Sequence, residues 1–290
     1  MNATPLDDLV RLLDLEVIEV NIFRGVSPPN ENRQRVFGGQ VAGQALVAAA
    51  RTVEQPVGGP LRRVHSLHAY FLRPGDPTVP ILYEVDRIRD GRSFTTRRVV
   101  AIQHGKVIFN LQASFHADES GLDHQLPMPD DVPDPESLPD YLTRNAPYQE
   151  LLGDMYDRPR PIDLRYVDAA PTERTGPLPP FQRVWLRADG TLPDDPLLHA
   201  CILTYASDMT LLDTTLLPHG FGFHDRHIQM ASLDHAMWFH RPFRADQWLL
   251  YNQGTPSTHG GRGLAYGSIF TRDGQLAVIV VQEGLIRTGR

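Results

Sequence analysis

Two long apolar stretches, each followed by strand-like runs, dominate the hydrophobic pattern of the chain. Residues 36–53 are rich in alanine and apolar almost all round, which predicts a buried helix because no polar face is left for solvent. Alternating runs predict strands at residues 64–72, 79–89, 93–103 and 106–116, the last after a turn at His104-Gly105. A buried helix followed by antiparallel strands predicts a sheet that wraps around the helix.

The second half of the chain repeats this order. We expect a strand at residues 181–187 and a helix at about 196–212, with Asp194 or Asp195 as its cap and Pro196 as its first residue. Strands are expected at 228–241, 247–255, 262–271 and 275–287, the last two joined by a turn at Asp273-Gly274. Near the N-terminus, residues 6–18 predict a short amphipathic helix or a helix that turns into a strand.

The two halves also share a sequence pattern. Residues 66–75 read SLHAYFLRPG and residues 232–243 read SLDHAMWFHRPF, and aligning their Arg-Pro pairs gives an offset of 168 residues. Gly91-Arg92 then falls near Gly261-Arg262, with a slip of only two residues. An offset kept along some 40 residues indicates two tandem copies of one small fold, and the interface between copies is a common place for a ligand site.

The stretch between the copies has a different composition. Residues 117–180 carry 12 of the 25 prolines and 14 acidic residues against five arginines. Prolines resist a long helix or a central strand, so we expect a linker that runs over the outside of both copies. The predicted domains are residues 1–116, the linker 117–180, and a C-terminal domain at 181–290.

Composition and charge narrow the functional classes. The net charge of −7 argues against nucleic acid as a partner, because neutralising phosphates requires a basic surface. No apolar run approaches the roughly 20 residues of a membrane helix, and the acidic start lacks a signal-peptide pattern. Cys201 is the only cysteine, which is typical of a reducing compartment. We therefore expect a cytoplasmic protein without a membrane partner.

Several familiar catalytic signatures are absent. Gly38 and Gly43 have the spacing of a phosphate-binding loop, but Gln44-Ala45 stands where that loop needs Lys and Ser or Thr. No Gly-x-Ser-x-Gly elbow occurs, and Cys201 lies within an apolar helix, where a lone cysteine is usually part of the core. The histidines at 219, 224 and 227 match no zinc signature, so no metal site is predicted.

Asp208 is the strongest candidate for chemistry. It lies in the otherwise apolar helix 196–212, where a buried carboxylate is unfavourable unless it is paired or used. The alternative is that it faces solvent or caps the end of the helix. The repeat places its counterpart near residue 40, and no acidic residue occurs between Asn32 and Thr52. Because the first helix needs no acid to fold, a catalytic or binding role in the second copy alone is favoured.

Two more polar residues interrupt apolar strands of the second copy. Ser232 precedes residues 233–235, and Gln282 follows an apolar run at 276–281. Each can simply pair with backbone, since buried amides and hydroxyls need hydrogen-bond partners. If all three side chains converge, Asp208 can take a proton from a water that Ser232 and Gln282 orient. That arrangement would hydrolyse an activated carbonyl without a covalent intermediate.

Six motifs, in order across nearly the whole chain, resemble the acyl-CoA thioesterase II family. They are VFGGQ at 36–40, HSLHAYFLRPGD at 65–76, DGRSF at 90–94, ASD at 206–208, DHAMWFHRP at 234–242 and VQEG at 281–284. The linker is the part least covered. The resemblance implies an α+β double hotdog fold, in which two copies of a long helix wrapped by an antiparallel sheet pack as a pseudo-dimer.

The resemblance also implies an activity and a site. The expected reaction is hydrolysis of fatty acyl-CoA to a free fatty acid and CoA, without metal or other cofactor. The family's water-activating triad of Asp, Thr or Ser, and Gln corresponds to Asp208, Ser232 and Gln282. The oxyanion donor is expected to be a backbone N–H at a helix N-terminus, which the sequence does not identify.

Binding partners and alternatives complete the expectations. Arg92, Arg97 and Arg98 are candidate ligands for the CoA phosphates. The family resemblance implies a homo-oligomer, a dimer or a tetramer. Two alternatives remain: a hotdog enoyl-CoA hydratase that uses His235 or His240 with Asp234, and a non-catalytic acyl-CoA-binding protein in which Asp208 is structural.

Overall fold

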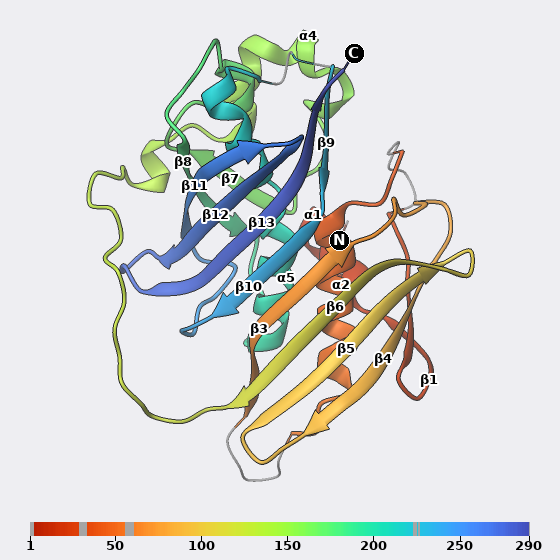
Figure 1. Cartoon of the computed structure of the whole chain (residues 1–290). Helices are drawn as coiled ribbons and strands as arrows, with labels where there is room; N and C mark the ends of the chain where they lie inside the picture. The colour runs from red at the N-terminus through yellow and green to blue at the C-terminus, as the bar shows by residue number, and fades with distance from the viewer. Residues whose placement is uncertain (1–2, 29–33, 56–60, 223–224, 226, 290) are drawn as a thin grey trace.

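The computed structural model describes residues 3–28, 34–55, 61–222, 225 and 227–289, and these form a large sheet curved around two central helices (Figure 1). The strands of the N-terminal half are β1 (Glu16–Glu19), β2 (Ile22–Gly25), β3 (Arg62–Phe71), β4 (Ile81–Asp90), β5 (Phe94–Gln103) and β6 (Lys106–Ala117). Those of the C-terminal half are β7 (Ile162–Tyr166), β8 (Phe181–Ala188), β9 (Ile228–Ser232), β10 (Asp234–Phe239), β11 (Leu249–His259), β12 (Arg262–Thr271) and β13 (Leu276–Thr288). The longer helices are α1 (Pro5–Leu13), α2 (Gly38–Arg51) and α5 (Pro196–Ser207).

The order of strands in the sheet shows the internal repeat. The order is β1-β2-β4-β5-β6-β3 in one half and β10-β13-β12-β11-β8-β7 in the other, with β9 beside β13. The second half is the first half in reverse, as a twofold axis between β3 and β10 requires. His68 and Ala236 differ by 168 in number and face each other across that junction. The tandem copies predicted from the sequence are confirmed, and they share one continuous sheet.

The two central helices pack against each other between the copies. Helix α2 is buried from Gly39 to Ala50, which its alanine-rich sequence allows. A Cβ at Gly39 would lie 2.4 Å from the carbonyl oxygen of Tyr205, and one at Gly43 would lie 3.2 Å from that of Cys201. These contacts run in opposite directions along the two helices. The N-terminus of each helix therefore lies beside the C-terminus of the other, and glycine is what permits the close approach.

Most predicted elements are confirmed, with shifts at their ends. The segment 6–18 is a helix followed by a strand, α1 and β1. The helix predicted at 196–212 ends at Ser207 and continues after a turn as a 3₁₀ helix, Leu212–His219. The strand predicted at 228–241 is broken at Leu233 into β9 and β10, so that β9 pairs with β13 while β10 pairs with β3.

The predicted linker differs from expectation in its second part. Strand β7 lies within the predicted linker 117–180, where it pairs with β8 at the edge of the sheet. It occupies the place in the C-terminal half that β1 occupies in the N-terminal half, so the second copy starts before Phe181. The first part runs around the outside of the C-terminal copy (Figure 1). Within the described residues, no helix is long and apolar enough to span a membrane.

Candidate active site

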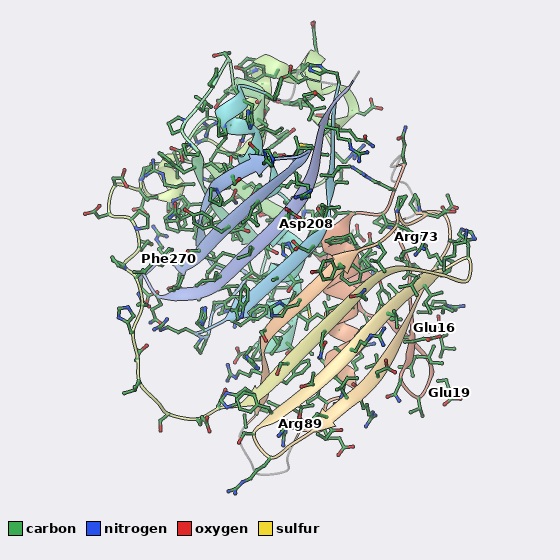
Figure 2. All side chains as sticks on the ribbon, in the orientation of Figure 1. Glu16, Glu19, Arg73, Arg89, Asp208 and Phe270 are labelled. Atoms are coloured by element: carbon green, nitrogen blue, oxygen red, sulfur yellow. The ribbon has the colours of Figure 1, made fainter. Side chains whose placement is uncertain are left out.

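The three predicted site residues converge at the junction of the copies. Asp208 is the C-cap of α5, Ser232 ends β9, and Gln282 lies in β13. Gln282 Nε2 donates to Asp208 Oδ1 at 2.6 Å and to Ser232 Oγ at 2.9 Å, and Ser232 Oγ donates to Asp208 Oδ1 at 3.3 Å. Figure 2 shows Asp208 between the two halves of the sheet. The three side chains therefore meet, which was the condition for water activation, and Asp208 also caps the end of α5, which was the alternative to a chemical role.

The register of the sheet explains why Ser232 and Gln282 meet. Ser232 pairs with Gly284 across the β9–β13 ladder, and Gln282 lies two residues before Gly284. Residues two apart in a strand point to the same face, so the hydroxyl and the amide are diagonal neighbours on one face. The break at Leu233 ends β9 at this point, which leaves Ser232 beside the end of α5.

The N-terminus of α2 lies beside Asp208 and completes the site. The backbone N–H of Gly39 donates to the Asp208 carboxylate, and the N-cap Phe37 offers no side-chain cap of its own. A Cβ at Gly38 would lie 2.8 Å from Asp208 Oδ2. Neither glycine was predicted from the sequence to be a site residue. A helix start without Ser, Thr, Asp or Asn was the available signal, because its free N–H groups and dipole attract an anion from elsewhere.

The environment of Asp208 tunes its acidity. Burial raises the pKa of Asp208 to about 6, against the opposing effect of hydrogen bonds from Gln282, Gly39 and Ser232 and of the positive charge of Arg35. A carboxyl group with this pKa is mostly ionised at neutral pH and still basic enough to accept a proton. Arg35, an exposed residue that donates to the Met230 carbonyl at 2.8 Å, was also missed as a neighbour of the site.

The orientation of the Gln282 amide follows from its partners. Asp208 Oδ1 only accepts, so the NH₂ group of Gln282 must face it. Gln282 is fully buried, and its Oε1 has no hydrogen-bond partner among the described residues. Buried carbonyl oxygens normally accept a hydrogen bond. The site therefore presents two acceptors, a carboxylate and an amide oxygen, which suits a small donor such as water.

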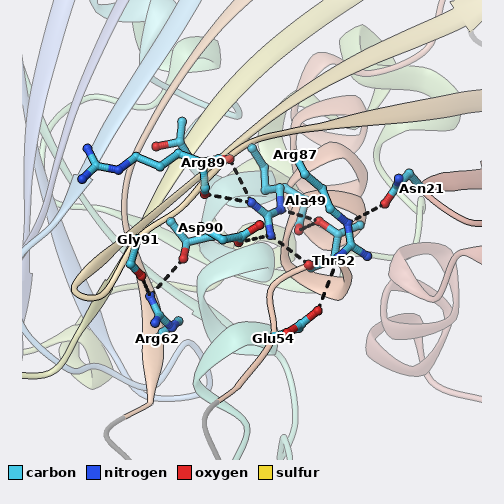
Figure 3. Close-up of polar contacts among 12 residues, drawn as sticks. Asn21, Ala49, Thr52, Glu54, Arg62, Arg87, Arg89, Asp90 and Gly91 are labelled. Carbon is cyan, nitrogen blue, oxygen red and sulfur yellow. Dashed lines mark hydrogen bonds and ion pairs between the residues drawn. The ribbon is translucent and has the colours of Figure 1, made fainter.

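The prediction that Arg97 binds a CoA phosphate is wrong. Its side chain is fully buried, with an exposed fraction of 0%. The guanidinium lies at the C-terminal end of α2, where it donates to Thr52 Oγ1 at 2.8 Å, to the Thr52 carbonyl at 3.0 Å and to the carboxylate of Asp90. Figure 3 shows Thr52 and Asp90 among the polar contacts of this region. A side chain without surface access and with these partners cannot meet an external phosphate.

Arg97 occupies the place that corresponds to the Asp208 site in the other copy. Thr52 is the C-cap of α2 as Asp208 is of α5, which corrects the expected counterpart near residue 40. Arg97 faces Ala113 across its ladder as Ala265 faces Gln282. The N-terminal copy thus has Thr, Val and Ala where the C-terminal copy has Asp, Ser and Gln; these are Thr52, Val64 and Ala113. The arginine fills the space, so the acidic site occurs once among the residues that the structure describes.

The other two arginines are exposed but lie elsewhere. Arg62, at the start of β3, donates to the carbonyl of Arg92, whereas Phe71, at the end of β3, contacts the position of Gly38 beside Asp208. Arg92 and Asp208 therefore lie at opposite ends of a ten-residue strand, roughly 30 Å apart. Arg98 pairs with Asp86 at 3.4 Å. A phosphate contact of Arg92 or Arg98 stays a prediction.

The residues named for a hydratase do not form an acid–base pair. His235 is buried and its Nε2 bonds with Ser207 Oγ at 2.9 Å, while Asp234 Oδ1 accepts from the N–H of Glu283 at 2.6 Å. Burial lowers the pKa of His235 to about 4 and raises that of the Cys201 thiol, so neither is a charged catalyst at neutral pH. Among the described residues, no three His, Cys, Asp or Glu side chains gather as metal ligands, and His224 lies outside them.

Two family models match the chain. Residues 27–116 match the acyl-CoA thioesterase N-terminal domain, and residues 163–285 match the acyl-CoA thioesterase model. The second match begins at β7, in agreement with the sheet order.

Individual relatives match along nearly the whole chain. Acyl-coenzyme A thioesterase 8 of Mus musculus is 44% identical over 287 residues, covering 95% of this chain and 88% of the relative. Acyl-CoA thioesterase 2 of Haemophilus influenzae is 40% identical over 289 residues, covering 97% and 98%. The crystal structure of an acyl-CoA thioesterase II from Mycobacterium marinum superposes with a TM-score of 0.78 at 47% identity, covering 97% of this chain and 98% of that chain.

Proposed function

Because the chain belongs to the acyl-CoA thioesterase family, with a double hotdog fold, we propose that Asp208, Ser232 and Gln282 activate the water that hydrolyses its acyl-CoA substrate. The protein is an acyl-CoA thioesterase, a hydrolase that acts on acyl-CoA thioesters. The observation that carries the catalytic assignment is the contact of all three side chains around one buried carboxylate, 2.6 Å from the Gln282 amide.

The chemistry follows from the two acceptors. The Asp208 carboxylate removes one proton from a water whose other hydrogen is held by Gln282 Oε1. The water oxygen attacks the thioester carbonyl carbon, and the C–S bond of the resulting tetrahedral intermediate then breaks. The products are a carboxylic acid and the CoA thiolate, which takes up the proton held by Asp208. Ser232 and the Gln282 amide N–H groups keep the carboxylate oriented towards the water.

The first turn of α2 stabilises the oxyanion. Its backbone N–H groups point towards the site, and one of them, at Gly39, already bonds to Asp208. Its aligned peptide dipoles place partial positive charge where the intermediate develops negative charge. Gly38 lacks a Cβ, so a thioester carbonyl can approach the backbone beside the Asp208 carboxylate. The N-terminus of α5 offers no equivalent, because Asp195 caps it and Pro196 has no N–H.

The proposal extends to substrate, assembly and compartment. We assign a fatty acyl-CoA as substrate and one catalytic centre per chain, because Arg97 fills the corresponding place in the N-terminal copy. A homo-oligomer, dimer or tetramer, follows from the family resemblance. The net charge of −7 favours neither nucleic acid nor an anionic membrane as a partner. The single cysteine, which is buried, fits a cytoplasmic protein.

Thiol release from a series of saturated acyl-CoAs, short to long, tests the assignment. We expect release by the wild type and a loss of at least about 100-fold in kcat for Asp208→Asn, which keeps the shape but not the base. Asp234→Asn is the matched control, since it changes a nearby half-buried carboxylate that only accepts from Glu283. Near-normal turnover by a folded Asp208→Asn enzyme would refute the base.

The same series separates the alternatives. Consumption of enoyl-CoA without thiol release, together with loss of activity in Asp234→Asn, would favour the hydratase. Binding of every acyl-CoA without turnover would favour a binding protein. The geometry does not favour the hydratase, because His235 is neutral and bonds to Ser207 rather than to a carboxylate.

A further inference from the structure

A buried polar network lies directly behind the turn that carries Asp208. It comprises five side chains from the segment before β8, from β8, from β11 and from the residues after α5: Arg174, Gln182, Gln253, Thr210 and Thr214. The exposed fraction is 4% for Arg174 and 2% or less for the other four. Thr210 is only two residues beyond Asp208, so this network holds the backbone of the catalytic turn.

A continuous path of hydrogen bonds joins Arg174 to Thr210. Arg174 Nη2 donates to Gln182 Oε1 at 2.6 Å. Gln182 Nε2 donates to the Thr210 carbonyl at 2.9 Å and to Gln253 Oε1 at 2.6 Å. Gln253 Nε2 in turn donates to Thr210 Oγ1 at 2.6 Å. Thr210 is therefore held at both its carbonyl and its hydroxyl.

The guanidinium at one end of this path determines which group donates and which accepts in each of its hydrogen bonds. A guanidinium only donates, so the Gln182 oxygen must face Arg174 and its NH₂ group must face Thr210 and Gln253. Gln253 then presents its oxygen to Gln182 and its NH₂ group to the Thr210 hydroxyl. Removing the guanidinium leaves a buried amide oxygen without a donor, which favours rotation of Gln182 and release of Thr210.

We propose that Arg174 is a positioning residue for catalysis, which through Gln182 and Gln253 holds Thr210 and thereby the turn that presents Asp208 to Gln282. The inference rests on the proposed function of Asp208. The segment before β8 was predicted from its composition to be part of a linker, and it thereby has a role in the reaction. Burial raises the pKa of Asp213, and the positive charge of Arg174 opposes that rise, so stability alone does not test the proposal.

The decisive comparison is between Arg174→Met and Arg165→Met. Arg165, in β7, donates to the carbonyls of Pro135 at 3.0 Å and Leu138 at 3.2 Å, so it holds another part of the predicted linker to the sheet. Its hydrogen bonds reach no member of the network around Thr210. We expect Arg174→Met to lower kcat about 10- to 100-fold with KM within twofold, because small displacements of a catalytic group have effects of that size. Arg165→Met is expected to lower stability and leave kcat unchanged.

Two further measurements distinguish positioning from loss of stability. Arg174→Lys keeps a donor for Gln182 and should recover most of kcat. The acid limb of the kcat/KM profile should move to higher pH in Arg174→Met. A displaced Asp208 loses hydrogen bonds that oppose the rise of its pKa on burial, so that pKa should rise further. The charged and titratable groups near Asp208 are Arg35 and Tyr251. Wild-type kcat and an unmoved limb in folded Arg174→Met would overturn the proposal.

Thr210 provides an independent test if Arg174→Met does not fold. Thr210→Val removes the hydroxyl that Gln253 binds, whereas Thr210→Ser keeps it. We expect the first to lower kcat and the second to preserve it; equal and normal kcat in both would overturn the inference. Asp208→Asn belongs in the same series. If it is inactive while the Thr210 variants are normal, only this inference fails; if it is active, the proposed base fails.

Discussion

Replacing the proposed base, Asp208, should make the protein more stable while it removes nearly all turnover. Asp208 is held as a buried carboxylate at neutral pH, with its pKa raised by burial from an ordinary 3.8 to about 6. A shift of about two units corresponds to about 3 kcal/mol of folding free energy lost in the charged form. The amide of Asp208→Asn carries no charge. It still accepts from Gln282, but its bond from Gly39 weakens by about 1 kcal/mol, leaving a net gain of about 2 kcal/mol.

The gain must depend on pH in a defined direction. Because the pKa of Asp208 is higher in the folded than in the unfolded protein, the folded protein binds this proton more tightly between pH 3.8 and about 6. The destabilisation by the carboxylate therefore grows as the pH rises through that window and is complete above it. Asp208→Asn should exceed the wild type by about 2 kcal/mol at pH 8, on the order of 5 °C in Tm, and by much less at pH 4.

The assay is denaturant and thermal unfolding of both proteins at pH 4 and pH 8, beside thiol release. Asp246→Asn is the control of opposite sign. Burial acts to raise the pKa of Asp246, but bonds from Arg244 and from the Leu192 N–H bring it below its ordinary value, so its loss should destabilise at pH 8. Equal or lower stability of Asp208→Asn at pH 8, or a difference that does not vary with pH, would refute the reasoning.

Three other outcomes follow from the site. In the wild type, kcat/KM should rise with pH through about 6 as Asp208 ionises, and a flat profile from pH 5 to 8 would contradict its role as base. Gly38→Ala should lower kcat at least about tenfold, because the added Cβ would lie 2.8 Å from Asp208 Oδ2. Gly121→Ala is the control: its Cβ would meet nothing within 4 Å, so this variant should match the wild type in thiol release. Arg97→Met should lower the free energy of unfolding by about 3 kcal/mol without raising KM, because it removes a buried, hydrogen-bonded guanidinium. Arg98→Met is the control, since Arg98 forms an exposed ion pair, and it should change the free energy of unfolding by less than about 1 kcal/mol. A raised KM in Arg97→Met would show that Arg97 contacts the substrate after all.

Local patterns in the sequence were enough for the elements and the repeat. Residues 36–53 have no polar face, so they can only be a buried helix, and α2 is buried from Gly39 to Ala50. Strand alternation and turn residues such as Asp273-Gly274 have a range of a few residues and placed most strands within about two residues of their ends. The fixed offset predicted two tandem copies, and the family resemblance implied their packing as a pseudo-dimer, which the pairing of His68 with Ala236 displays.

Edge pairing was not predictable in the same way. Strand β7 is short and lies among prolines, and it becomes a strand because β8 offers an open edge. Its sequence IDLRY alternates apolar and polar residues, so a strand signal is present, but only over five residues. The surrounding prolines and acidic residues outweighed that short pattern and led to its assignment to the linker.

Asp208, Ser232 and Gln282 could be chosen as candidate site residues from the sequence, because polar residues that interrupt apolar segments stand out and match the family pattern. Their convergence, the raised pKa of Asp208 and the Gly39 N–H that bonds to it arise only when α5, β9, β13 and α2 pack together. Arg97 is the opposite case, a residue that the sequence suggested was exposed. Contacts with Thr52, 45 positions away, bury it in the folded chain. Local sequence determines which segments are helix or strand, whereas burial and electrostatics depend on neighbours that only the folded chain brings together.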